Sequence, residues 1–206
     1  MSTGLRRCRP QRPVTNVDTE DNVRILRTTM MVLFLVGLLL AAEGGEQEYE
    51  QASDFTLPDL VGRNVQLSAL LAIGPVYVEF WDRSCANCIA ELDALVPTYD
   101  TLKERGLQMV ALSVDKAADE ARVRALFNGK KWPYVCLLDQ QNEVKRAYGI
   151  IIKPAAYLVN QQGEIVYTHI GYKKGDENRI KVEILKWLPA EENDSVPDSE
   201  SPDGDR

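Results

Sequence analysis

Two cysteines separated by two residues, Cys85 and Cys88, are the residues of this 206-residue chain best suited to chemistry. They follow residues 76–81 (VYVEFW), an apolar stretch typical of a strand, and they begin residues 85–104, which have the apolar spacing of an amphipathic helix. Two thiols at this spacing can close a disulfide, and the positive end of the helix dipole stabilises a thiolate on the first of them. The pattern indicates redox chemistry at a strand-to-helix junction.

A structural disulfide and a structural zinc site are the alternatives for this pair. A loop this short adds little chain-entropy stabilisation, and a single CxxC supplies only two of the four ligands of a structural zinc. Of the other cysteines, Cys8 lies near the start of the chain, and Cys136 lies in an apolar run where a buried, inert thiol is expected. Redox use of the pair is therefore favoured, and no metal or cofactor is expected.

Glu79 stands in the middle of the predicted strand 76–81. Alternation along the strand places it on the same face as Tyr77 and Trp81, beneath the helix that carries the cysteines. A carboxyl buried there would have a raised pKa and could relay a proton to or from the second sulfur during exchange. The alternative is an exposed glutamate on an edge strand.

Glu91 follows Cys88 at the same i, i+3 spacing at which Cys88 follows Cys85, so the three residues lie on one stripe of the helix. A negative charge at Glu91 would raise the pKa of Cys88 and help to keep that sulfur protonated. The alternative is an ordinary glutamate on an exposed helix face.

Pro154 precedes residues 156–159, a further predicted strand. A proline cannot donate to a strand ladder, so it marks a strand start or a turn, and its peptide bond can be cis. His169, the single histidine, ends another predicted strand. A surface or core histidine with satisfied hydrogen bonds is expected, because no second histidine or acid is spaced to complete a metal site.

The middle of the chain alternates predicted strands and helices. Strands are expected at residues 55–57, 64–67, 76–81, 107–114, 135–138, 156–159 and 164–169, and helices at 85–104, 117–127, 143–148 and 176–187. This order predicts an α/β fold whose sheet has a parallel core and an antiparallel edge.

The two ends differ from this middle part. Residues 1–27 are basic, 28–42 form a short apolar run, 43–52 are an acidic linker, and 189–206 form an acidic tail. A basic flank, a short apolar core and small residues near Ala42 predict an exported protein with a cleaved signal, and the alternative is an uncleaved membrane anchor. The basic segment and the acidic tail are expected to be disordered.

The charge of the chain restricts its partners. Without residues 1–42, 18 basic residues stand against 28 acidic ones, a formal charge of −10. Such a balance argues against nucleic acid as a partner and against electrostatic adhesion to an anionic membrane surface.

The strand VYVEFWDRS, the CxxC, Glu91 three residues beyond it, and a proline 66 residues after the second cysteine together resemble the thioredoxin superfamily. The stretch ASDFTLPDLVGRNVQLSAL is similar to the N-terminal hairpin of TlpA-like and ResA-like thiol-disulfide oxidoreductases. The strand ALSVD, the added helix 117–127 and the hairpin YLVNQQGEIVYTHIG match that subgroup too. The resemblance covers residues 53–188. It implies a thioredoxin-like domain with an N-terminal β-hairpin, an inserted helix and strand, and a central mixed sheet flanked by helices.

The same resemblance implies roles for individual residues. Cys85 would be the nucleophile, Cys88 the resolving thiol, and Pro154 the cis-proline facing their disulfide. Glu79 stands at the buried-acid position, and Glu91 stands at the acid that tunes the active site. The implied function is an exported thiol-disulfide oxidoreductase, a reductant of protein disulfides as in cytochrome c maturation, with a membrane partner that re-reduces it.

The chain departs from the superfamily pattern at Ser84 and Asn87, where Trp and Pro are usual, and its helix proline, Pro97, lies about a turn late. Because the residues between the cysteines tune the potential, the choice between reductant and oxidant stays open at this point. Two other functions are the alternatives. A peroxiredoxin would need a threonine where Asp82 stands, three residues before the first cysteine, and a Sco-like copper chaperone would need a wider cysteine spacing and a histidine.

Overall fold

The computed structural model describes residues 48–190, together with the isolated positions Arg27 and Met30. The predictions for the basic segment, the apolar run and the disordered tail concern residues that lie almost wholly outside this part. The chain divides into two units, residues 1–48 and 49–206, and the second is described below. Within the described residues, no helix is both long enough and apolar enough to cross a membrane.

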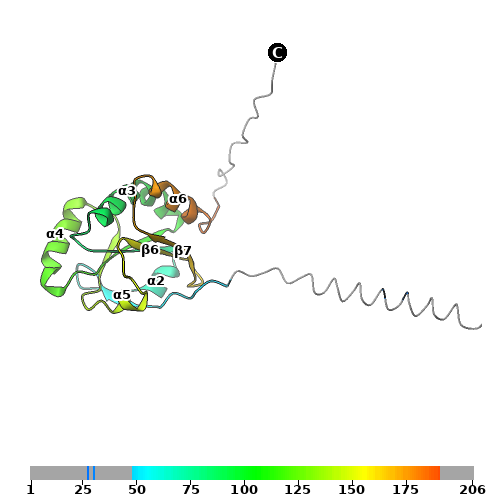
Figure 1. The fold of residues 1–206 in the computed structure, drawn as a ribbon, viewed down its shortest axis with the longest axis horizontal. Helices are drawn as coiled ribbons and strands as arrows, with labels where there is room; N and C mark the ends of the chain where they lie inside the picture. Colours follow the sequence, from blue (N-terminus) through cyan, green and yellow to red (C-terminus); the bar gives the residue numbers. More distant parts are fainter. Residues whose placement is uncertain (1–26, 28–29, 31–47, 191–206) are drawn as a thin grey trace, which may run out of the picture. The chain divides into compact units, whose positions relative to one another are not determined.

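A five-stranded mixed sheet forms the centre of the second unit (Figure 1), and its strand order is β5-β4-β3-β6-β7. The strands are β3 (Val76–Trp81), β4 (Gln108–Ser113), β5 (Val135–Leu138), β6 (Ala155–Val159) and β7 (Ile165–Ile170). β3 pairs in parallel with β4, and β4 with β5, whereas β6 is antiparallel to both β3 and β7. β3 is thus the central strand, and the predicted parallel core with an antiparallel edge is confirmed.

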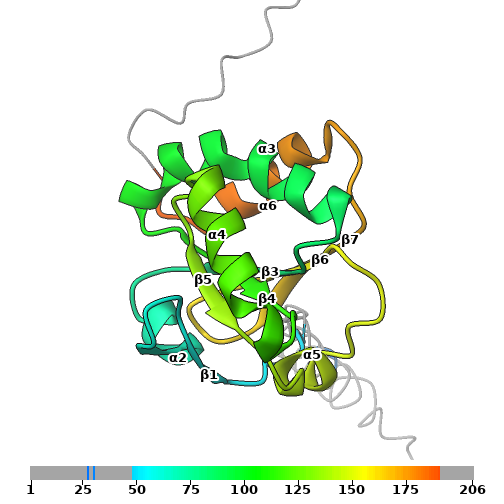
Figure 2. The same cartoon turned by 90° about the vertical axis from the view of Figure 1, so that its left-hand side faces the viewer.

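Helices cover both faces of this sheet (Figure 2). One face packs against α3 (Ala86–Leu102), α4 (Glu120–Lys130) and α6 (Asp176–Leu185). The other packs against α2 (Leu67–Leu71) and α5 (Glu143–Ala147). Every residue of β3 is buried, because both faces of the central strand lie under helices.

A small antiparallel hairpin of β1 (Thr56–Pro58) and β2 (Asn64–Gln66) precedes the sheet. The second strand was expected to include Leu67, but this residue instead begins α2, which the sequence analysis did not predict. A helix of five residues is too short to show a helical period, so hydrophobic spacing could not identify it. Leu67 is buried against the sheet, as an apolar residue in that position should be.

The long helices differ from expectation mainly at their ends. α3 begins one residue after Cys85 and passes into a 3-10 turn, Lys103–Arg105, which ends at Gly106 with a φ of 100°. A glycine adopts this left-handed conformation without steric cost, as expected of a helix stop. The helix predicted over 117–127 is a 3-10 turn, Ala117–Asp119, followed by α4, which extends to Lys130.

Candidate active site

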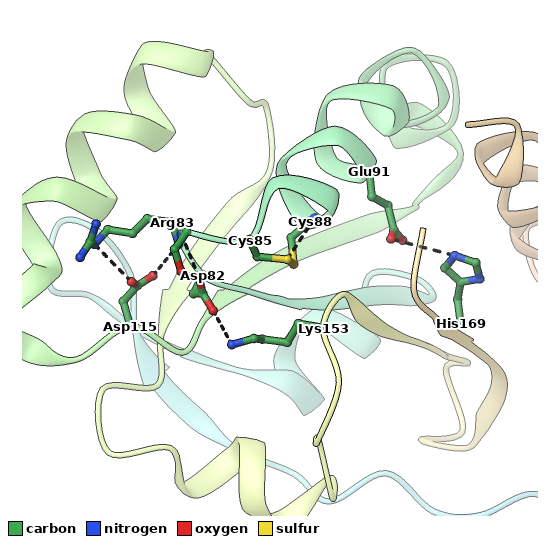
Figure 3. The surroundings of a disulfide bond; sticks show 9 residues. Asp82, Arg83, Cys85, Cys88, Glu91, Asp115, Lys153 and His169 are labelled. Carbon is green, nitrogen blue, oxygen red and sulfur yellow. Dashed lines mark hydrogen bonds and ion pairs between the residues drawn. A yellow bond between two sulfur atoms is a disulfide. The ribbon is translucent and has the colours of Figure 1, made fainter. Parts of the chain in front are cut away.

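The CxxC lies where β3 leads into α3, and its two cysteines form a disulfide with an S–S distance of 2.03 Å (Figure 3). Cys85 is the N-cap of α3, and its sulfur accepts a hydrogen bond from the backbone N–H of Cys88 over 3.2 Å. Cys85 is half-buried, whereas Cys88 is fully buried. A partner can therefore approach the first sulfur more readily than the second, and the helix terminus favours a thiolate on that first sulfur.

An ion pair connects the loop between β3 and the cysteines to the residue that precedes Pro154. Lys153 and Asp82 form this pair, and their side chains are only 23% and 15% exposed. Asp82 also accepts hydrogen bonds from the backbone N–H and the hydroxyl of Ser84. Burial alone would raise the pKa of Asp82, but the hydrogen bonds from Lys153 and Ser84 outweigh it and lower that pKa. The sequence analysis missed this pair, because its members are 71 residues apart.

Arg83 connects the same loop to the acidic residues that follow β4. The backbone N–H of Arg83 donates to Asp115 over 3.0 Å, and the Arg83 guanidinium lies 3.0 Å from Asp119. The hydroxyl of Ser113, the last residue of β4, donates to Asp115 as well. The loop that presents Cys85 is thus fixed from two sides, which keeps the disulfide in one place between β3 and α3.

Glu79 is fully buried in the central strand, so the expectation of a buried carboxyl rather than an edge-strand glutamate is confirmed. Its register neighbours are Ala111 on β4 and Ala156 on β6, two small residues beside the carboxyl. Neither carboxyl oxygen has a hydrogen-bond partner among the described residues. Burial, and secondarily the charge of Glu91, raises the pKa of Glu79 well above its ordinary value.

Glu91 is also fully buried, which excludes the alternative of an ordinary exposed helix glutamate. Its Oε1 accepts a hydrogen bond of 2.8 Å from the hydroxyl of Tyr77. Burial raises the pKa of Glu91 to about 7, helped by the charge of Asp176, while the Tyr77 hydrogen bond opposes the rise. Near neutral pH this carboxyl is therefore poised between its two protonation states, as a group that exchanges protons should be.

His169 is a core histidine, with 4% of its surface exposed, but the expectation that its hydrogen bonds are satisfied is wrong. Its Nε2 has no hydrogen-bond partner in the described part of the chain. That nitrogen lies 4.0 Å from Oε2 of Glu91 (Figure 3). It also lies 3.8 Å from Oδ2 of Asp176. No spacing in the sequence predicts this cluster, because β7, α3 and α6 meet only in the folded chain.

Pro154 is buried and follows a cis peptide bond from Lys153. The role that the resemblance implies for it, contact with the disulfide, stays a prediction. Cys136 is buried and free, and burial raises the pKa of its thiol well above the ordinary value, so it is an inert thiol as expected. No set of three or more histidine, cysteine or acidic side chains within residues 48–190 is arranged to hold a metal ion.

Residues 49–168 of the chain match the AhpC/TSA family. Thiol-disulfide oxidoreductase ResA of Halalkalibacterium halodurans is 32% identical over 122 residues, which cover 59% of this chain and 68% of that protein. ResA of Bacillus subtilis (strain 168) is 26% identical over 148 residues, which cover 68% of this chain and 81% of the relative.

A solved structure from Chlorobium tepidum, described as a thiol:disulfide interchange protein DsbE, has the same fold with a TM-score of 0.62. It is 24% identical, and the match covers 68% of this chain and 96% of that chain. At this identity the likeness concerns the fold alone, whereas the ResA relatives are named as thiol-disulfide oxidoreductases.

Proposed function

Because this chain belongs to the AhpC/TSA family and is a ResA-like thiol-disulfide oxidoreductase of the thioredoxin superfamily, we propose that it reduces disulfides of protein substrates outside the cytoplasm. The observation that carries this proposal is the asymmetry of the disulfide, with half-buried Cys85 and fully buried Cys88, in a core that also buries the carboxyls of Glu79 and Glu91.

In the first step, the reduced enzyme uses Cys85 as the nucleophile. Its thiolate, stabilised by the start of α3, attacks one sulfur of the substrate disulfide. A bond forms between Cys85 and that sulfur, the substrate S–S bond breaks, and the other substrate sulfur leaves as a thiolate that takes up a proton. The product is a mixed disulfide between enzyme and substrate.

In the second step, Cys88 resolves the mixed disulfide. A buried carboxylate, Glu79 or Glu91, accepts the thiol proton of Cys88, and the new thiolate attacks the sulfur of Cys85. The bond from Cys85 to the substrate breaks, the substrate leaves reduced, and the enzyme carries the Cys85–Cys88 disulfide seen in the structure. A raised carboxyl pKa suits this task, because it brings the base closer to the pKa of a thiol.

The buried carboxyls also support the reducing direction. Strong oxidants of this chemistry owe their potential to a stabilised reduced form, in which a thiolate is favoured. When Glu79 or Glu91 is ionised, its negative charge disfavours a thiolate nearby. The reduced form of the cysteine pair is therefore stabilised less than in such an oxidant. An electron donor must then restore the dithiol after each turnover, and we assign that role to a membrane redox partner.

The N-terminal pattern supports export. Arginines precede the short apolar run 28–42, and glutamates follow it, as in a secretory signal or an N-terminal anchor. We propose that the domain lies on the outer face of the cytoplasmic membrane, or in the periplasm where the cell has this compartment. Cytochrome c maturation is a process there that consumes a thiol reductant.

The two other functions receive less support from the site. The position that a peroxiredoxin gives to a threonine is occupied by Asp82, whose carboxylate is engaged by Lys153 and Ser84. A Sco-like copper site would need a histidine near the cysteines, and the single histidine faces Glu91 and Asp176 instead.

The reduction potential of the Cys85–Cys88 couple tests the proposal. We expect a value near the roughly −270 mV of thioredoxin, measured by equilibration of the full chain with glutathione or dithiothreitol buffers. A potential above about −150 mV, close to the roughly −120 mV of DsbA, would overturn the reducing role. Peroxide consumption and copper retention, assayed on the same sample, would reveal the alternatives.

A further inference from the structure

The proposed exchange makes no use of the buried imidazole of His169 and does not say how the proton of Cys88 reaches solvent. Glu91 has no exposed surface, so a proton that it takes from Cys88 has no direct way to solvent. Its Oε1 is bound to Tyr77, which is itself fully buried, so this side of the carboxyl leads back into the core. The other oxygen, Oε2, has no hydrogen-bond partner among the described residues and faces Nε2 of His169 over 4.0 Å.

Exposure rises in steps from Glu91 towards the surface. The Glu91 side chain is 0% exposed, that of His169 is 4% exposed, and that of Asp176, at the start of α6, is 25% exposed. Nε2 of His169 lies between the two carboxyls, 4.0 Å from one and 3.8 Å from the other. A single imidazole nitrogen thus faces an internal and a solvent-accessible carboxyl at nearly equal distance.

The register of the sheet places His169 on the same row of paired residues as Glu79, the second buried acid. Glu79 on β3 pairs with Ala156 on β6, and Ala156 pairs with His169 on β7. Residues paired in register have their side chains on the same face, so all three point towards α3 and α6. The small side chain of Ala156 separates the Glu79 carboxyl from the imidazole. The ring of His169 is also stacked on Tyr167, with 14° between the ring planes.

We infer that His169 is the proton exit of the active site and passes protons between Glu91 and Asp176. This inference rests on the proposed role of a buried carboxylate as the base for Cys88. His169 touches neither the sulfurs nor the substrate in this assignment, so it is a positioning residue for protons and not a catalytic residue.

The relay consists of proton transfers only. Glu91, having taken the Cys88 proton, gives it to the lone pair of Nε2 and returns to a carboxylate, while His169 becomes an imidazolium. The imidazolium gives the proton from Nε2 to Oδ2 of Asp176, which exchanges it with solvent. Each transfer needs the side chains to approach by about 1 Å, a tightening that catalytic hydrogen bonds commonly undergo when a site is engaged.

The charged and titratable groups around His169 determine whether its imidazole is neutral or protonated. Tyr77 and Glu79 face it from β3, Tyr167 from β7, and Asp176 and Arg179 from α6, with Tyr172 nearby in the chain between them. Burial lowers the pKa of His169, and Arg179 lowers it further, while Asp176 raises it. A neutral imidazole with a free lone pair is the form that can accept a proton from Glu91.

Two variants of the full chain test the relay, with one matched control. His169→Gln removes the titrating nitrogen, and Asp176→Asn removes the outer acceptor while its amide oxygen can still accept from Lys173, as Oδ2 does. Glu177→Gln is the control, because it removes an equal charge from the same turn of α6. The Glu177 carboxylate accepts hydrogen bonds from Tyr172 and Gly175 and has no place in the relay.

The measurement is stopped-flow reduction of a fluorescent peptide disulfide, in which attack by Cys85 and release through Cys88 are resolved as functions of pH. We expect His169→Gln to slow release at neutral pH by about tenfold or more, to flatten the pH profile of that step and to leave the attack unchanged. Asp176→Asn should slow release by a smaller factor, and Glu177→Gln should match the wild-type chain.

Several outcomes would overturn the relay. These are wild-type release in His169→Gln, equal slowing of both steps, or a loss in Glu177→Gln as large as that in Asp176→Asn. If His169→Gln does not fold, Asp176→Asn decides the matter, since the Asp176 side chain is 25% exposed and its change leaves the core histidine in place. A wild-type chain without any release step through Cys88 would instead contradict the proposed exchange mechanism itself.

Discussion

The hydroxyl of Tyr77 donates a hydrogen bond of 2.8 Å to Oε1 of Glu91 inside the core, across the interface between β3 and α3. A hydrogen bond to a carboxylate favours the charged form. Burial and the nearby charge of Asp176 favour the neutral form, and the balance leaves the pKa of Glu91 at about 7. One tyrosine thus keeps a fully buried acid able to lose its proton near neutral pH.

Tyr77→Phe should raise the pKa of Glu91 above this value. A hydrogen bond to a charged group is worth about 1.5–3 kcal/mol, so the shift should be roughly one to two pH units. Release of substrate from the mixed disulfide should then reach its maximum rate at a correspondingly higher pH. A pH–rate profile of that step measures the change, and an unchanged profile would mean that Glu91 is not the base.

The stability of the oxidised protein should fall as the pH rises from about 4.5 to 7 and beyond. Glu79 and Glu91 have raised pKa values in the folded state, so in this window the folded chain binds more protons than the unfolded chain. Their favourable contribution is complete below the ordinary value of 4.5 and is lost as the pH passes through the folded-state pKa.

Glu91→Gln should make this decline smaller by on the order of 3 kcal/mol, the equivalent of a pKa that moves from 4.5 to about 7. Urea unfolding of wild type and variant at acid and alkaline pH measures the difference. The exposed Glu104 offers a control, because Glu104→Gln should decline in parallel with the wild type. A wild-type stability that rises with pH over the window would contradict the assigned direction.

The identity of the base can be decided between the two buried acids. Glu79→Gln is nearly isosteric, and Glu79 has no hydrogen-bond partner to lose among the described residues, so the fold should survive. If Glu79 takes the proton of Cys88, this change slows release more than it slows the initial attack. Single-turnover kinetics of the two steps, compared with those of Glu91→Gln, measure the contribution of each acid. Equal slowing of both steps would assign Glu79 a structural role.

Short-range patterns explain what the sequence could predict of this site. The CxxC, the start of α3 and the face of Glu79 follow from spacing within one strand and one helix, and the structure has them as expected. The partners of these residues come from elsewhere in the chain. Tyr77 reaches Glu91 across a strand–helix interface, and His169 reaches it only because β7 and α6 pack beside α3. Spacing in a single sequence contains no such tertiary information, so the relay could not be predicted.

The ion pair of Lys153 and Asp82 should stabilise the loop that presents the cysteines. Lys153→Met removes the charge but keeps the length of the side chain, and it leaves the mostly buried Asp82 carboxylate with the hydrogen bonds from Ser84 but no ion-pair partner. We expect a loss of about 1–3 kcal/mol in the free energy of unfolding. The double variant with Asp82→Asn should recover part of it, and a double-mutant cycle in urea gives the coupling energy. A coupling energy near zero would show that the pair contributes nothing to the loop.

Cys85 should be the thiol that reacts first in the reduced protein. It is half-buried at the start of α3, where the helix dipole favours its thiolate, whereas Cys88 lies inside the helix and is fully buried, and burial disfavours its ionisation. Limited alkylation followed by peptide mapping should find the label on Cys85.

Cys88→Ser should therefore accumulate the mixed disulfide with a substrate, because the attacking thiol is present and the resolving thiol is missing. Cys136→Ser is the matched control and should change neither result, since that thiol is buried and has a raised pKa. If the mixed disulfide accumulates in Cys85→Ser instead, the two roles are reversed and the route assigned to the proton of Cys88 fails with them.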